Sequence, residues 1–352
     1  MRSRKIRIIS VMMAVLIMSL GIVGCQNKIK DLNETVALLN DKEISIGVAN
    51  FLTKYRQASY ETYYGSLFGD DMWNQDIYGD GRTLAQSTKE DIMSSIEEMY
   101  LLDEHKGEYN VELTDADNTK ILKAAEDFMA ANSKEAIEKT SATTEIIEEV
   151  LRLFTVRAKV YDAIVAKADT NVSDEEAAQR TFSYLRFNLT GKTDESGNTV
   201  EYTDDEKNKI REDAKAYLER AKAGETLDDL AKEADTMVLK YSYGSDESEN
   251  GTMDKTVIEA ADKLNEGELS EVIESEDVVY IIRLDSTFDA EATASKKEEI
   301  INTRKSDLYN ETIEGWKADS NFEIKQDVWK KVDFKTPLNI TTAKTEESST
   351  EQ

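Results

Sequence analysis

The sequence contains very few of the side chains that most often carry covalent or metal chemistry. Its 352 residues include one cysteine, Cys25, and one histidine, His105. A single cysteine forms no disulfide within the chain, and one cysteine with one histidine is too few for a Cys/His zinc site or a histidine-dependent catalytic triad. His105 precedes Gly107 at an expected helix end, where a cation interacts favourably with the helix dipole, so we predict a structural role for it.

Positive charge is also scarce. The chain has 44 Lys and Arg residues against 72 Asp and Glu residues, and a formal net charge of −28. The first 24 residues contain four basic side chains and no acidic one, so the remainder carries 40 basic and 72 acidic residues, a net charge of −32. Phosphate neutralisation needs clustered Lys and Arg, so this balance argues against binding nucleic acid. It also argues against lying flat on an anionic membrane surface.

The N-terminus has the pattern of a secretory signal peptide. Four basic residues stand within the first seven positions, a short apolar run follows from Ile8, and small residues precede Cys25. These features predict a signal peptide over residues 1–24 rather than a transmembrane helix. Cys25 after Ile22-Val23-Gly24 resembles the bacterial lipobox, in which the cysteine is acylated and becomes the first mature residue. The alternative is a plain signal peptide with an incidental cysteine. Residues 25–35 then read as a tether.

The block from residue 36 to 172 is predicted to be mostly helical after a short strand–turn–strand over 36–46. The clearest helix carries an apolar stripe at three- and four-residue spacing, which indicates a core face. Its members are Ile147, Val150, Leu151, Phe154, Ala158, Tyr161 and Val165. An aromatic stretch from Tyr55 to Trp73 has two interpretations: helical core, or an exposed surface that binds other chains.

Residues 173–287 alternate between strand and helix patterns. Strands are expected at 181–189, 237–243 and 278–284, with helices from Thr203, from Leu227 and over 257–264. A long helix over about 290–317 and strands at 322–324 and 332–334 make a C-terminal part over 288–336. The stretch 337–352 is rich in Thr, Ser and Glu, and we expect it to be disordered.

Three phrases in the middle block resemble the parvulin family of prolyl isomerases. They are a helix ending in Ala-Gly-Glu followed by Leu-Ala-Lys-Glu, a Leu-x-x-Gly-Glu-Leu-Ser turn, and a closing Tyr-Ile-Ile-Arg-Leu strand, found at 221–233, 264–272 and 279–284. The flanks at 36–46 and 172–176 resemble the PrsA-like and SurA-like foldases. The resemblance implies an α+β fold: a helical N-terminal chaperone domain completed by a C-terminal helix and strand, with an inserted parvulin-like domain of βααβαβ type.

The sequence departs from the parvulin pattern at the positions that the resemblance assigns to the active site. Tyr184 and Tyr280 stand where parvulins usually keep two histidines, on the first and last strands. Met253 matches the methionine of the family's proline pocket, and Val257 replaces its phenylalanine. The resemblance therefore implies a reduced substrate site made of these four residues, with the two tyrosines as the candidate catalytic groups. The family's Gly-Gly-Asp-Leu-Gly loop is replaced by residues 243–251.

These features lead to a hypothesis about function. We expect a lipid-anchored foldase on the outer face of a bacterial cytoplasmic membrane, binding unfolded or partly folded exported proteins, with weak or absent isomerase activity. The alternatives are an active peptidyl-prolyl isomerase and a scaffolding lipoprotein. We expect no cofactor and no metal. The run from Asp246 begins like a calcium loop, but its twelfth position is Val257 and not the required Glu.

Overall fold

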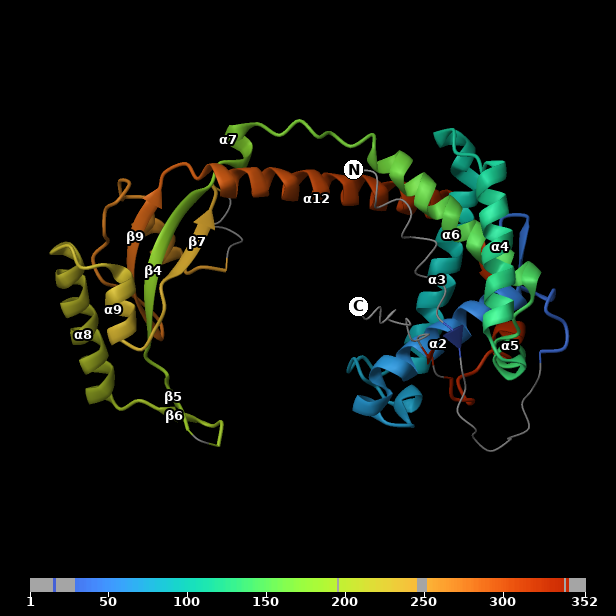
Figure 1. Ribbon diagram of the computed structural model, residues 1–352, viewed down its shortest axis with the longest axis horizontal. Helices are drawn as coiled ribbons and strands as arrows, with labels where there is room; N and C mark the ends of the chain where they lie inside the picture. Colours follow the sequence, from blue (N-terminus) through green and yellow to red (C-terminus); the bar gives the residue numbers. More distant parts are fainter. Residues whose placement is uncertain (1–14, 17–28, 195, 246–251, 339, 342–352) are drawn as a thin grey trace, which may run out of the picture. The chain divides into compact units, whose positions relative to one another are not determined.

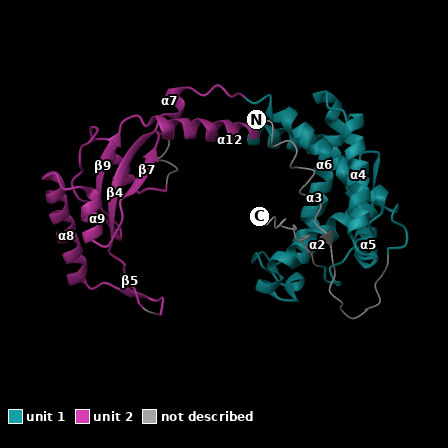
Figure 2. Ribbon diagram, in the orientation of Figure 1, with its two compact units in different colours: residues 1–168, 306–352 teal, residues 169–305 magenta. Residues whose placement is uncertain are grey.

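The computed structural model describes residues 15–16, 29–194, 196–245, 252–338 and 340–341. It divides into two compact units, which are coloured separately in Figure 2: unit 1, residues 1–168 and 306–352, and unit 2, residues 169–305. Cys25 and nearly all of the expected signal peptide lie outside the described residues. Within the described ranges, no helix has the length and apolar character needed to cross a bilayer.

Unit 1 contains a three-stranded antiparallel sheet built from both ends of the chain. Strands β2 (Thr35–Leu39) and β3 (Lys42–Ser45) form the expected hairpin, and β10 (Phe322–Ile324) pairs with β2. Asn40 takes the left-handed conformation that the tight turn requires, with a φ of 51°. The pairing of β10 with β2 confirms that a C-terminal strand completes the N-terminal part.

The rest of unit 1 is helical (Figure 1). Two of its helices begin with capping boxes, Thr83 with Gln86 and Thr114 with Asp117, which satisfy the first free N–H groups. Ser45 caps the first long helix by accepting from the Val48 N–H. The elements are α2 (Ile46–Phe68), η1 (Met72–Asn74), α3 (Leu84–His105), η2 (Lys106–Tyr109), α4 (Asp115–Ala131), α5 (Lys134–Thr140) and α6 (Thr144–Val165).

The buried face of α6 differs from the expected stripe in its second half. Tyr161 is 41% exposed, and the fully buried positions are Leu153, Val156, Val160 and Ile164. Three of these pack with Ile313 of the long helix α12 (Ala290–Asp319), in a second small core beside the main one. The helix therefore buries two overlapping faces against different neighbours, which one stripe cannot represent.

Two expectations for the C-terminal part are wrong. Val332, Asp333 and Phe334 form no strand; they follow the short helix α13 (Gln326–Trp329) as irregular chain. Side chains of α2 bind the carbonyl groups of Asp333 and Phe334, so these groups need no strand partner. The expected disorder also begins too early, because the Leu338 side chain is 1% exposed. Strand β11 (Ile340–Thr341) pairs with β1 (Val15–Leu16), and residues 342–352 lie outside the described residues.

Unit 2 is a four-stranded antiparallel sheet of order β7-β4-β9-β8 with helices on both faces. Its strands are β4 (Arg180–Asn188), β7 (Leu239–Tyr243), β8 (Ile273–Ser275) and β9 (Val278–Ser286). Helices α8 (Asp204–Lys222) and α9 (Leu227–Glu233) cover one face through Leu185, Val279 and Ile281. Helix α11 (Lys255–Ala261) covers the other face through Phe182 and Ile282. The mixed helix and strand architecture confirms the α+β class.

Unit 2 also contains a short hairpin, a short helix before its sheet, and the first part of α12. A hairpin of β5 (Gly191–Thr193) and β6 (Thr199–Glu201) leads into α8, which begins with a Thr203–Glu206 capping box. Helix α7 (Asp174–Ala177) precedes β4, and Ser173 caps it by accepting from the Glu176 N–H. Unit 2 extends past residue 287 into α12 because Arg304 donates to the Asn171 carbonyl oxygen and pairs with Glu176.

Candidate functional site

The two candidate tyrosines lie on the face of the unit 2 sheet that α11 covers. Tyr184 of β4 is opposite Ile282 of β9, and Arg186 is opposite Tyr280. The tyrosines are therefore diagonal neighbours on the same face, a distance that long aromatic side chains bridge. Their ring centroids are 6.0 Å apart, with planes inclined at 50°.

Met253 and Val257 join the same apolar cluster. Val257 projects from α11 and is fully buried, whereas Met253 lies just before the helix and is half-buried. Tyr280 is 9% exposed and Tyr184 is half-buried. The structure thus brings all four predicted residues together. Val257 forms the floor of the cluster, and Tyr184 and Met253 are its more accessible members.

The surroundings of Tyr280 favour its neutral hydroxyl group. Burial raises the pKa of Tyr280, with the nearby Arg186 opposing the shift. Within the described ranges, which omit residues 246–251, no side chain or backbone group forms a hydrogen bond with either hydroxyl. Both groups can therefore donate to a bound carbonyl oxygen, but no described neighbour holds either hydroxyl in one orientation.

Asp254 positions α11 at this site, and the sequence reasoning missed it. Its carboxylate accepts hydrogen bonds from the Thr256 N–H at 2.7 Å and from the Ser275 hydroxyl on β8. These bonds, chiefly the one from Ser275, hold the pKa of Asp254 below its ordinary value. An Asp immediately before a short helix is a typical helix cap, and that pattern was the available signal.

The remaining wall of the cluster is aromatic. The Phe182 ring, which is fully buried, lies 5.7 Å from the rings of Tyr184 and Tyr241 and 5.8 Å from that of Tyr243. The pKa of Tyr243 is raised to about 12, mainly because the side chain is buried and secondarily because its hydroxyl donates a hydrogen bond to Asp262. The alternation of aromatic residues along β4 and β7 was the sequence signal for this wall.

The side chains of the cluster are mainly apolar and aromatic. The cluster offers apolar and aromatic surface with two tyrosine hydroxyls and contains no imidazole. Across the described ranges no group of three or more His, Cys, Asp or Glu side chains is arranged to hold a metal ion. Such a site suits a small apolar ring next to a hydrogen-bond acceptor.

The aromatic stretch of unit 1 is partly buried and partly exposed. Some of its side chains belong to a core and others are available for binding, so each of the two expected interpretations holds for part of it. Trp73 is 6% exposed and belongs to a small core, whereas Tyr63, Leu67 and Tyr78 are 70%, 73% and 60% exposed. His105 is the last residue of α3, and its ring stacks on Trp316 with centroids 4.2 Å apart. That packing agrees with a structural role for the histidine.

Comparison with known protein families shows which type of domain unit 2 contains. Residues 193–297 match the family model described as the PPIC-type PPIase domain. The match contains Met253, Val257 and Tyr280, and it begins after β4, so Tyr184 lies outside it. The sheet unit therefore carries a parvulin-type domain.

Similarity to curated proteins extends over most of the chain. The foldase protein PrsA of Clostridium tetani is 26% identical over 338 residues, covering 88% of this chain and 93% of that protein. PrsA of Clostridium perfringens is 25% identical over 307 residues, covering 83% and 86%. The crystal structure of PrsA from Lactococcus lactis is 16% identical and covers 84% of this chain and 96% of that one, with a TM-score of 0.35. The sequence relationships identify the chain as PrsA-like, a relative of the parvulin-type foldases.

Proposed function

We propose that this protein is a membrane-anchored extracytoplasmic foldase whose parvulin-type domain binds clients with weak or absent isomerase activity. The observation that carries the proposal is the pair of tyrosines, Tyr184 and Tyr280, which lie with Met253 and Val257 in one apolar cluster on the sheet of unit 2. The relatives over most of the chain are foldases by name, which supports the chaperone part. The clients would be unfolded or partly folded exported proteins.

The low isomerase activity follows from what catalysis of this reaction needs. Rotation about an X–Pro bond requires no proton transfer, and uncatalysed exchange takes roughly tens of seconds. Acceleration comes from hydrogen-bond donors held in place for the twisted amide. The hydroxyls of Tyr184 and Tyr280 have no hydrogen-bond partner among the described residues, so the cluster favours binding the proline ring over stabilising its twisted state.

Two further features support client binding and anchoring. The side chains of Tyr63, Tyr64, Leu67 and Tyr78 are exposed, and exposed apolar groups are typical of binding sites. The net charge of −32 carried by the residues after the signal peptide keeps the protein soluble and attracts basic segments. Acylation of Cys25 would hold it at the outer face of the cytoplasmic membrane, and labelling with a fatty-acid analogue that is lost in Cys25→Ser tests this step.

A proline-limited refolding assay, run beside an aggregation assay, separates the candidate functions. We expect suppressed aggregation of a denatured client and no acceleration of the proline-limited phase. An active isomerase would accelerate refolding, and a Tyr184→Phe/Tyr280→Phe double variant would lose the effect. Tyr217→Phe is the matched control, because Tyr217 stacks on Phe187 on the opposite face of the sheet. No effect in either assay would leave the scaffolding role.

A further inference from the structure

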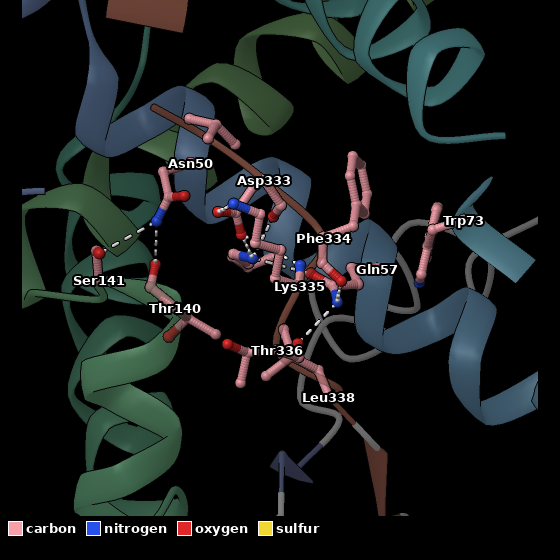
Figure 3. Close-up of polar contacts among 12 residues, drawn as sticks. Asn50, Gln57, Trp73, Thr140, Ser141, Asp333, Phe334, Lys335, Thr336 and Leu338 are labelled. Carbon is pink, nitrogen blue, oxygen red and sulfur yellow. Dashed lines mark hydrogen bonds and ion pairs between the residues drawn. The ribbon is translucent and has the colours of Figure 1, made fainter. Parts of the chain in front are cut away.

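Residues 329–338 of unit 1, here called the C-terminal segment, contact the rest of the unit through side chains in the main core and through their main chain. Figure 3 shows the main-chain contacts from Asp333 onward. Lys54 of α2 donates to the carbonyl oxygen of Asp333. One turn further along α2, the Gln57 side-chain amide donates to the carbonyl oxygens of Phe334 at 3.2 Å and Thr336 at 2.8 Å. A face of this helix therefore binds groups that every peptide possesses.

The same mode of binding continues at both ends of the segment. The Glu61 carboxylate accepts the N–H of Leu338 and the indole N–H of Trp73. On α3, Lys89 donates to the carbonyl oxygens of Trp329 at 2.9 Å and Val332 at 2.7 Å. The row of binding side chains thus consists of Lys54, Gln57, Glu61 and Lys89, and it is here called the main-chain clamp.

The clamp residues are costly to bury without a peptide against them. Gln57 is fully buried and Lys54 is 6% exposed. Lys54 also donates to the Gln57 side-chain oxygen at 3.0 Å, and Gln57 donates to the Glu61 carboxylate at 2.8 Å, so the segment's carbonyl groups supply the remaining hydrogen-bond partners of these buried donors. If the C-terminal segment left, the donors and the acceptor would be open to water and matched to the main chain of another extended peptide.

An aromatic row connects the clamp to the exposed surface of α2. The Phe334 ring stacks on Trp73 with centroids 4.2 Å apart, and Trp73 stacks on Tyr60 at 5.9 Å. Tyr60 contacts Tyr64, which is 48% exposed, at 5.8 Å. A bound chain with spaced aromatic residues can therefore follow these rings from the exposed surface to the Phe334 position.

We infer that the main-chain clamp and Trp73 form a peptide-binding site, that the C-terminal segment is its resident ligand, and that an extended peptide carrying an aromatic residue replaces it. The aromatic side chain takes the place of Phe334, and the clamp binds the flanking carbonyl groups whatever the neighbouring sequence. This inference deepens the proposed chaperone function and rests on it, since it names where an unfolded client is held.

The resident ligand sets the affinity for added peptides. A tethered segment competes at an effective concentration on the order of millimolar, so a free peptide binds the intact protein weakly. Weakening the resident segment raises the fraction of open sites, and the apparent affinity for an added peptide rises by the same factor. The inference therefore predicts tighter binding from a variant that has lost a contact of its own.

The test uses a fluorescent peptide with the sequence of residues 331–338 and the full-length protein. We expect Phe334→Ala to bind this peptide roughly tenfold more tightly than the unaltered protein, because its resident segment is weakened. Adding Gln57→Leu should remove the gain, and a peptide with alanine in place of phenylalanine should bind poorly. Phe288→Ala, which alters an exposed ring in unit 2, is the matched control and should behave as the unaltered protein.

Hydrogen exchange on the unaltered protein provides a second test that needs no variant. Excess peptide should speed exchange of the Leu338 amide, which Glu61 binds, and leave the buried part of α6 unchanged. Absence of peptide binding by a folded Phe334→Ala variant, or an unchanged Leu338 amide at saturating peptide, would overturn the inference. Aggregation suppression that persists in that case keeps the proposed chaperone function, whereas loss of both refutes the two together.

Discussion

Asn40 and Asn321 exchange two hydrogen bonds that fasten the C-terminal strand to the first hairpin. The Asn40 N–H donates to the Asn321 carbonyl oxygen at 2.8 Å, and the Asn321 N–H donates to the Asn40 side-chain oxygen at 3.0 Å. Asn40 makes the second bond while holding a positive φ, which few residue types tolerate. One side chain thus serves both the turn and the closure of the sheet.

Asn40→Ala should destabilise unit 1 by about 1–2 kcal/mol, since alanine loses the hydrogen bond and resists the left-handed conformation. Asn40→Gly is the matched control: it accepts the backbone conformation and loses only the side-chain bonds. Urea denaturation of the two variants measures the difference. Equal losses would mean that the conformation of the turn contributes nothing.

Lys54 should make stability depend on pH in the alkaline range. Burial, opposed by the charge of Asp333, lowers the pKa of Lys54 to about 8. The unfolded chain therefore binds more protons than the folded one between about pH 8 and 10.5, so stability contributed by this site rises with pH across that window. Relative to Lys54→Met, the free energy of unfolding should increase by roughly 2 kcal/mol from pH 7 to 9.5.

Chemical denaturation at several pH values measures this difference. Lys123→Met is a suitable control, because Lys123 is exposed and pairs with Asp127 on its own helix. A pH-independent gap between Lys54→Met and the unaltered protein would show that Lys54 titrates normally in the folded state.

Val257, the fully buried residue of the candidate isomerase site, should tolerate neither a smaller nor a larger side chain. Val257→Ala leaves a cavity in a fully buried position and should cost about 2 kcal/mol. Val257→Phe restores the residue type that the family carries, but in this packed cluster it should cost about 1–3 kcal/mol through overpacking. Thermal unfolding measures both effects. A Phe variant as stable as the unaltered protein would indicate unfilled space beside α11.

Local patterns predicted most elements of the fold. Capping pairs such as Thr203 with Glu206 placed helix starts correctly, and the β-branched run at 278–284 was predicted as a strand, which is β9. The site residues Tyr184 and Tyr280 were predicted from the resemblance to parvulins, and the pairing of β4 with β9 places both on one face of the sheet. These features depend on near neighbours or on regular pairing.

The errors lie where distant side chains decide the structure. Phe334 looks like a strand residue by composition, but Lys54 and Gln57 of a helix near the other end of the chain bind the carbonyl groups around it. The exposure of Tyr161 likewise depends on where α12 meets α6. Hydrophobic spacing within one segment contains no information about such partners, so periodicity alone cannot predict them.

The start of α12 in unit 2 should depend on Asp289. Its carboxylate accepts the N–H groups of Glu291 and Ala292, each at 3.0 Å, and the Thr181 hydroxyl of β4 at 2.7 Å. These hydrogen bonds, chiefly that from Ala292, hold the pKa of Asp289 below its ordinary value. The stabilisation is therefore present above the unfolded pKa and is lost as pH falls through the folded one.

Asp289→Ala should cost about 1–2 kcal/mol at neutral pH, the range seen for lost helix caps. Asp289→Asn keeps a capping oxygen and should cost less. The gap between Asp289→Ala and the unaltered protein should narrow below about pH 3, because the protonated carboxyl loses its charge and keeps only a neutral capping oxygen. Denaturation curves at pH 7 and pH 3 decide the matter, and a gap that is equally large at both pH values would contradict a role for the carboxylate charge.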